Sequence, residues 1–162
     1  MQNDSHGPWY YEQLVLGFNY RITDIHAALG LSQLKRIDSF IEARNNIAKE
    51  YNHMLSELPL KLPFISPSVL SSFHLYIICL ENKNESSHSY VFKNLREKGI
   101  LVNLHYIPVY LHPFYQKLGF KKGYCQNAEK FYSRAISIPI YPNLTREDQL
   151  FVVKSIKESL AE

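Results

Sequence analysis

The stretch LGFNYRITDIHAALGLSQL (residues 16–34) places an amide and a guanidinium group directly before a long amphipathic pattern. Asn19 and Arg21 lie on an aromatic-flanked turn, and Thr23 starts the helical pattern. Three explanations compete: a helix cap, a structural salt bridge and a binding site for an anion. Hydrogen-bond donors gathered before a helix N-terminus favour anions, because the helix dipole and its free amides add to them. A loop held by Asn19, with Arg21 paired to a carboxylate, explains the same residues.

A second candidate site lies in NLHYIPVY (residues 103–110), where His105 and Tyr106 follow an apolar run. Pro108 bars further ladder pairing, so these two side chains are expected at the end of a strand. Ligand sites of α/β proteins form where strands end. A histidine and a tyrosine that are hydrogen-bonded within the rim of a sheet would give the same pattern.

Other chemistries find little support. The seven histidines form no metal pattern, because the closest pair, His105 and His112, is separated by Pro108 and fits neither a helix face nor a usual zinc spacing. GxSxG, P-loop and GxGxxG motifs do not occur. Cys125 has no base beside it in the sequence. We therefore expect no metal and no cysteine nucleophile.

A long helix must position the first candidate site. Apolar residues recur at three-four spacing from Asp24 to about Leu58, which corresponds to roughly nine turns. Thr23 is a good N-cap, Asp24 complements the helix dipole, and Pro59 ends the run. A single helix of this length is too long for the interior of a 162-residue globule, so it must lean on another body or bridge two.

The remainder of the chain alternates between strand and helix patterns, and Thr145 with Asp148 resembles a capping box at the start of the last helix. The pattern predicts an α/β (α+β) domain with a small sheet of about three strands covered by helices. Strands are expected at residues 73–81, 100–110 and 135–141, and helices at residues 86–98, 111–118 and 125–135 and from residue 145 onward.

Composition restricts the class of protein. The chain is 46% hydrophobic and 20% charged with a net charge of +3, which indicates a globular fold. Lysine and arginine are scattered, so no nucleic-acid partner is expected. No apolar run approaches the length of a membrane span, and the N-terminus lacks the apolar segment of a signal peptide. Two cysteines without CxxC spacing favour a reducing compartment, so we expect a soluble cytoplasmic protein.

Three blocks together resemble one family. GPWYYEQLVLGFNYRITDIHAALGLSQLKRID, LREKGILVNLHYIPVYLHPFYQKLGF and AEKFYSRAISIPIYPNLTREDQ occur in the order found in the DegT/DnrJ/EryC1/StrS sugar aminotransferases, which use pyridoxal phosphate (PLP). The resemblance extends over nearly the whole chain. Within the family, the chain most resembles the branch that aminates UDP-linked 4-keto-6-deoxy-N-acetylhexosamines, as in the pathway to pseudaminic acid.

The resemblance implies the C-terminal part of a type I aminotransferase fold. Residues 1–22 would form an active-site loop that belongs to the large domain, residues 23–58 a helix between domains, and residues 59–162 the small domain. The chain matches about the last two-fifths of such an enzyme. The lysine that holds PLP as a Schiff base would lie upstream of Met1, so this chain would contain no catalytic residue and be inactive alone.

The family also implies roles for the candidate residues. In its homodimers the loop that matches residues 17–21 reaches the partner's active site. Asn19 matches a residue that hydrogen-bonds the PLP phosphate, and Arg21 matches a residue near the nucleotide sugar. His105 and Tyr106 match positions near the nucleotide-sugar pocket. The implied reaction moves an amino group, usually from glutamate, to the C4 ketone of the sugar.

Two other functions fit the same residues. A truncated chain could act as a non-catalytic interaction module that dimerises through its long helix, because a lone domain must bury the exposed apolar stripe at Leu34, Ile37 and Ile41. Some relatives within the family are sugar dehydratases, in which histidine replaces the PLP lysine. The residue that separates these reactions lies outside this chain.

Overall fold

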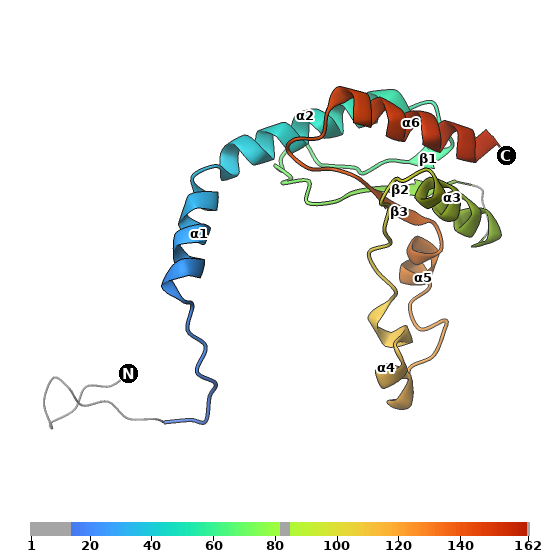
Figure 1. Ribbon diagram of the computed structural model, residues 1–162. Helices are drawn as coiled ribbons and strands as arrows, with labels where there is room; N and C mark the ends of the chain where they lie inside the picture. The colour runs from blue at the N-terminus through green and yellow to red at the C-terminus, as the bar shows by residue number, and fades with distance from the viewer. Residues whose placement is uncertain (1–13, 82–84, 162) are drawn as a thin grey trace, which may run out of the picture. The chain divides into compact units, whose positions relative to one another are not determined.

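The computed structural model describes residues 14–81 and 85–161 and contains helices and a small antiparallel sheet, as expected for an α/β domain (Figure 1). The chain divides into two units, Met1–Arg36 and Ile37–Glu162. In chain order the elements are α1 (Asp24–Leu34), α2 (Ile37–Leu55), β1 (Leu60–Lys61), β2 (Tyr76–Leu80), α3 (Glu85–Glu97), the 3-10 helix η1 (Val109–Leu111), α4 (Pro113–Lys117), α5 (Gln126–Tyr132), β3 (Ala135–Ile138) and α6 (Arg146–Ala161).

The described part of the first unit is an extended segment followed by α1. Thr23 has extended backbone dihedrals, and its hydroxyl accepts a hydrogen bond from the His26 backbone amide at 3.4 Å, which confirms it as the N-cap. Asp24 lies in the first turn, where its charge complements the helix dipole. None of the residues of α1 is buried.

The prediction of one unbroken helix over residues 24–58 was wrong, because two residues separate α1 from α2. At the junction the Arg36 amide donates to the Gln33 carbonyl at 3.0 Å, three residues back, so a tighter 3-10-type bond replaces the α-helical one. The second helix then ends at Leu55 rather than at Leu58.

The sheet has the strand order β1-β2-β3, and both pairings are antiparallel. Burial alternates along β2: Tyr76, Ile78 and Leu80 are fully buried on one face, whereas Ile77 and Cys79 are half-buried on the other. This alternation has the period expected of a strand with one face on the core. Burial also raises the pKa of the Cys79 thiol.

The strand predicted over residues 100–110 was wrong. Within it only Asn103 pairs with the sheet, through an isolated antiparallel bridge to Ser137 of β3. The third strand of the sheet is instead β1, which has two residues and was not predicted. The helix expected at residues 111–118 is divided into η1 and α4, and the helix expected at residues 125–135 is the shorter α5.

The core lies between the sheet and the helices α2, α3 and α6. Figure 1 shows α2 and α6 over one side of the sheet, and α4 and α5 on the other side. The Tyr51 hydroxyl of α2 donates to the Pro139 carbonyl at 3.0 Å, and the Tyr76 hydroxyl donates to the Asn52 side chain at 2.5 Å, so both buried hydroxyls have partners. Burial raises the pKa of both tyrosines well above the usual value.

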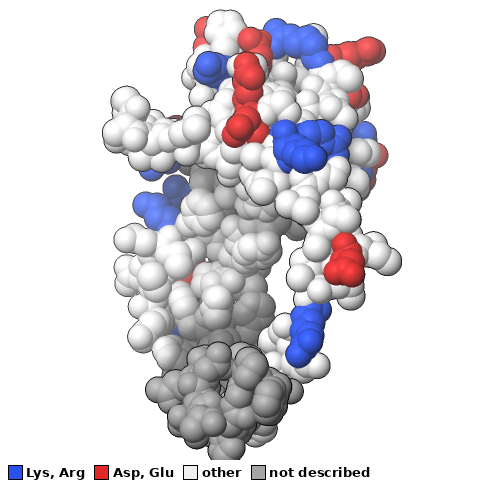
Figure 2. Space-filling view, turned by 90° about the vertical axis from the view of Figure 1, so that its left-hand side faces the viewer, with Lys and Arg blue, Asp and Glu red and all other residues white. Residues whose placement is uncertain are grey.

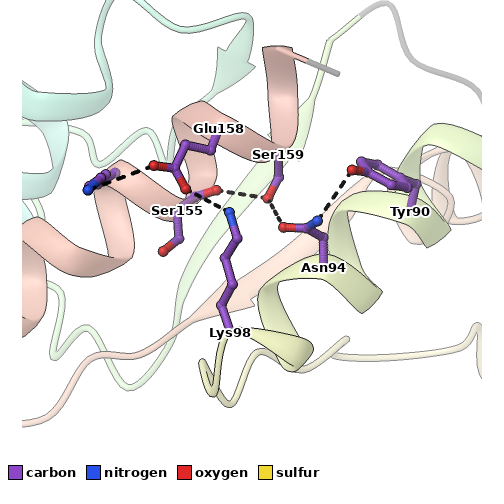
Figure 3. A network of polar contacts seen from close by, with 7 residues as sticks. Tyr90, Asn94, Lys98, Ser155, Glu158 and Ser159 are labelled. Carbon is purple, nitrogen blue, oxygen red and sulfur yellow. Dashed lines mark hydrogen bonds and ion pairs between the residues drawn. The ribbon is translucent and has the colours of Figure 1, made fainter.

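Polar groups also join α3 to α6 (Figure 3). The buried Ser159 hydroxyl lies 2.8 Å from the Asn94 side-chain oxygen and 2.8 Å from the Ser155 carbonyl. At the edge of this contact Lys98 and Glu158 form an ion pair at 2.7 Å. The serine side chains are small, and no buried side-chain nitrogen or oxygen of the described residues lacks a hydrogen-bond partner.

Thr145 caps α6 as predicted. Its hydroxyl accepts from the Asp148 amide at 3.1 Å and donates to the Asp148 carboxylate at 2.6 Å.

We expect Thr145→Ala to lower the free energy of unfolding by about 1 kcal/mol, because the Asp148 amide in the first turn of the helix loses its acceptor. Urea denaturation would measure this loss. Thr145→Ser, which keeps the hydroxyl, should stay close to the wild type, and an equal loss in both variants would contradict the capping role.

Apolar side chains are exposed at the N-terminal end of the described chain, among them Leu29, Leu31 and Leu34 of α1. Of the predicted exposed stripe, Leu34 and Ile37 are exposed, whereas Ile41 is half-buried. Exposed apolar side chains grouped on one helix, such as Leu29, Leu31 and Leu34, are typical of a surface that a partner covers.

We therefore expect the isolated chain to self-associate. Light scattering at rising concentration should show a growing mass, and the double variant Leu29→Gln/Leu31→Gln should reduce this growth, since glutamine keeps the helix propensity. Gln33→Lys on the same helix is the control for a change of surface composition. A monomer at all concentrations would rule out self-association through this helix.

Charge is distributed in small groups. On the face drawn in Figure 2, lysine and arginine side chains occur as separate clusters with Asp and Glu between them, rather than as one continuous basic surface. Among the described residues, no helix is both long enough and apolar enough to span a membrane.

Candidate functional site

Asn19 and Arg21 contact each other on the exposed segment before α1. The Arg21 Nε–H donates to Asn19 Oδ1 at 3.0 Å. Because Thr23 caps the helix, Asn19 is not the cap. The ion pairs formed by the described residues do not include Arg21, so the expected alternative of a carboxylate partner is not observed among them.

The hydrogen bond between Arg21 and Asn19 leaves other N–H groups of both side chains available to donate to a ligand. The bond from Arg21 orients the Asn19 amide through its oxygen, and the NH2 of that side chain can only donate. The Arg21 terminal nitrogens are also donors that no described residue accepts from. A phosphate oxygen accepts hydrogen bonds and carries negative charge, so this pair fits the phosphate of PLP or of a nucleotide.

His105 and Tyr106 contact each other at the rim of the sheet. Their rings meet edge to face, with centroids 4.6 Å apart and an interplanar angle of 88°, and the peptide bond between them is cis. His105 is half-buried, whereas Tyr106 is 72% exposed. Neither residue ends a strand as expected, because residues 100–110 form none; His105 is hydrogen-bonded to the sheet, whereas Tyr106 is exposed.

Sequence reasoning missed two neighbours of His105. Ser137 Oγ lies 2.8 Å from His105 Nδ1, and Asn103 Nδ2 lies 3.4 Å from His105 Nε2. A signal for Ser137 existed, because a serine within the apolar strand sequence AISI needs a hydrogen-bond partner when it is buried.

The segment after Tyr106 is held by a separate polar cluster. The Tyr110 hydroxyl donates to the Glu129 carboxylate at 2.6 Å, and the Gly123 amide donates to the same oxygen at 2.6 Å. These two hydrogen bonds lower the pKa of Glu129. The Cys125 amide donates in turn to the Tyr110 hydroxyl at 3.2 Å, so one carboxylate ties η1 to the loop before α5.

The two predicted pairs belong to different units of the chain. Asn19 and Arg21 lie in Met1–Arg36, and His105 and Tyr106 lie in Ile37–Glu162. Within each unit the structure brings the predicted pair together. Within residues 14–81 and 85–161, no three His, Cys, Asp or Glu side chains are grouped as a metal site would need.

The chain is similar in sequence to known aminotransferases. A sequence model of the DegT/DnrJ/EryC1/StrS aminotransferase family matches residues 2–157. The UDP-4-amino-4,6-dideoxy-N-acetyl-beta-L-altrosamine transaminase of Campylobacter jejuni is 36% identical over 149 residues, which cover 89% of this chain and 38% of that protein. The chain spans about two-fifths of the length of the curated relatives that it matches, and it corresponds to their C-terminal part.

Solved structures agree with the sequence comparison. Helicobacter pylori PseC, an aminotransferase of pseudaminic acid biosynthesis, superposes with a TM-score of 0.84 at 30% identity over 97% of this chain and 42% of PseC. Spr1654 of Streptococcus pneumoniae, named a sugar aminotransferase, superposes in its pyridoxamine phosphate form with a TM-score of 0.89 at 28% identity, over 97% of this chain and 40% of Spr1654. A PLP form of Spr1654 is also similar, and PLP is the cofactor of the family. The chain thus belongs to the DegT/DnrJ/EryC1/StrS aminotransferase family.

Proposed function

We propose that this chain forms the C-terminal part of a PLP-dependent nucleotide-sugar aminotransferase. Its substrate would be a UDP-linked 4-keto-6-deoxy-N-acetylhexosamine, its amino donor glutamate, and its product a 4-amino sugar for surface glycans. The similarity to PseC over 97% of this chain is the observation that carries the proposal. The Schiff-base lysine would come from the part of the enzyme that this chain does not match, so the chain alone would be inactive.

The residues described above would bind and orient rather than transfer protons. The Asn19 NH2 would donate to the PLP phosphate in a homodimer, and Arg21 would hold the Asn19 amide while its free nitrogens face the anionic sugar nucleotide. His105 and Tyr106 would form part of the wall around the nucleotide sugar. The bound cofactor would supply the electron sink for moving the amino group.

A chimera tests the substrate. Residues 2–162 of this chain would replace the matching part of the C. jejuni transaminase, and mass spectrometry would follow conversion of the UDP-4-keto sugar to the 4-amino sugar with glutamate. We expect the chimera to form the amine. The unaltered C. jejuni enzyme is the positive control. A folded chimera that binds PLP but leaves the UDP-4-keto sugar unchanged would contradict the proposed substrate.

A second experiment tests the cofactor on the chain by itself. After incubation with PLP and reduction with borohydride, mass spectrometry should find scattered or negligible labelling of lysines. Stoichiometric labelling of one lysine would show that this chain holds the cofactor alone, and the proposed division of the site would then be wrong.

A further inference from the structure

Ser137 of β3 connects the His105 segment to the sheet in two ways, through its side chain and through its backbone. Ser137 of β3 is 5% exposed, and its hydroxyl lies 2.8 Å from His105 Nδ1. Two residues before His105, Asn103 exchanges both backbone hydrogen bonds with the same Ser137, at 3.1 Å and 2.7 Å. The backbone bridge between Asn103 and Ser137 therefore holds His105 close enough for its ring to contact the buried Ser137 hydroxyl.

Hydrogen-bond chemistry assigns the tautomer of this ring. The Leu104 amide donates to Asn103 Oδ1 at 2.8 Å, which identifies the oxygen end of the Asn103 side chain. Its nitrogen end, 3.4 Å from His105 Nε2, can only donate, so Nε2 must accept. The ring proton then lies on Nδ1 and is donated to Ser137 Oγ. Both nitrogens of the ring are engaged within the chain.

Tyr106 differs from its neighbour in this respect. Its side chain is 72% exposed, and its hydroxyl makes no hydrogen bond with any described residue. The edge-to-face contact with His105 holds one side of the ring, and Pro108 restricts the backbone two residues later. Tyr106 thus presents a free hydroxyl and a ring face from an anchored base.

We propose that Ser137 and Asn103 are positioning residues, which fix the His105 ring and, through its contact with Tyr106, the tyrosine ring beside it. The inference rests on the proposed function, in which Tyr106 is part of the wall around the nucleotide sugar. A phenol hydroxyl and ring suit a ligand with sugar hydroxyls, phosphates and a flat base. Both nitrogens of the His105 ring have a hydrogen-bond partner within the chain, which favours an orienting role over proton transfer.

Nitrogen-15 NMR of the full chain, labelled at histidine, tests the anchor without any activity. His105→Asn identifies the His105 signals. We expect the Nδ1–H tautomer in the wild type, in Ser137→Thr and in Ser137→Ala, because the Asn103 amide still donates to Nε2 in all three. The exposed variant Asn103→Ala removes that donor and should give a mixture of tautomers. An Nε2–H tautomer in the wild type, or an unchanged tautomer in Asn103→Ala, would overturn the assignment.

Kinetics of the chimera test the division of roles. Tyr106→Phe should raise KM for the nucleotide sugar about tenfold with little change in kcat, the effect of one lost hydrogen bond in ligand binding. His105→Asn should raise KM as well but leave the pH dependence of kcat unaltered. Loss of one limb of that pH profile in His105→Asn would show that His105 transfers a proton. A chimera without turnover, combined with the expected tautomer, would reject the proposed function while the anchor stands.

Discussion

Asn19→Asp in the chimera is expected to weaken PLP binding by on the order of a hundredfold, and Asn19→Ala by about tenfold. Aspartate has the shape of asparagine and can still accept the bond from Arg21 Nε. It lacks the NH2 donors, however, and it brings a negative charge towards the phosphate. The loop contact is thereby kept while the proposed phosphate contact becomes repulsive.

Absorbance titration with PLP would measure the dissociation constant of each variant. Arg21→Lys is the matched control, because it removes the planar bond to Asn19 but leaves the amide donors and the positive charge in place. Its PLP affinity should fall less than that of either Asn19 variant. If Asn19→Asp binds PLP as tightly as the unsubstituted chimera, Asn19 does not contact the phosphate.

The largest loss of stability outside the apolar core is expected from Arg44→Met. Arg44 Nη1 of α2 donates to the carbonyls of Phe73 at 3.1 Å and Ile140 at 2.9 Å, with a longer contact to His74 at 3.4 Å. Phe73 has a φ of 43°, a left-handed conformation that a bulky residue seldom adopts. Removing the guanidinium leaves partly buried carbonyls without their donor, which should cost about 3 kcal/mol.

Urea unfolding of the isolated chain would measure this cost. Methionine retains much of the apolar stem of the arginine, so the loss would report the hydrogen bonds rather than packing. Arg44→Lys should recover only part of the stability, since an ammonium group cannot span all three carbonyls. A change below about 0.5 kcal/mol in Arg44→Met would mean that water satisfies these carbonyls equally well.

Features with a local cause could be predicted from the sequence. Thr23 and Thr145 were identified as caps because a hydroxyl acts on amides two or three residues away. The strand β2 was expected within residues 73–81 because its β-formers form one dense apolar run. These signals lie within one turn or one strand and need no knowledge of the remaining chain.

Features that depend on distant residues could not be predicted. No glycine or proline marks the turn at Lys35 and Arg36, both good helix formers, so the apolar spacing continues through the break. Two residues of β1 are too few to show alternation. The contact of His105 with Ser137 joins residues 32 positions apart, and only the register of β3 brings them together.

The lack of any buried residue in α1 has a consequence for how assembly could be observed. An 11-residue helix with no buried residue gains little stability from packing, and so short a helix is only marginally stable in water because helix nucleation is unfavourable. Amide protons of α1 should therefore exchange with solvent almost as fast as in an unfolded chain until a partner surface covers them. Their slowing would report the moment at which a partner surface covers α1.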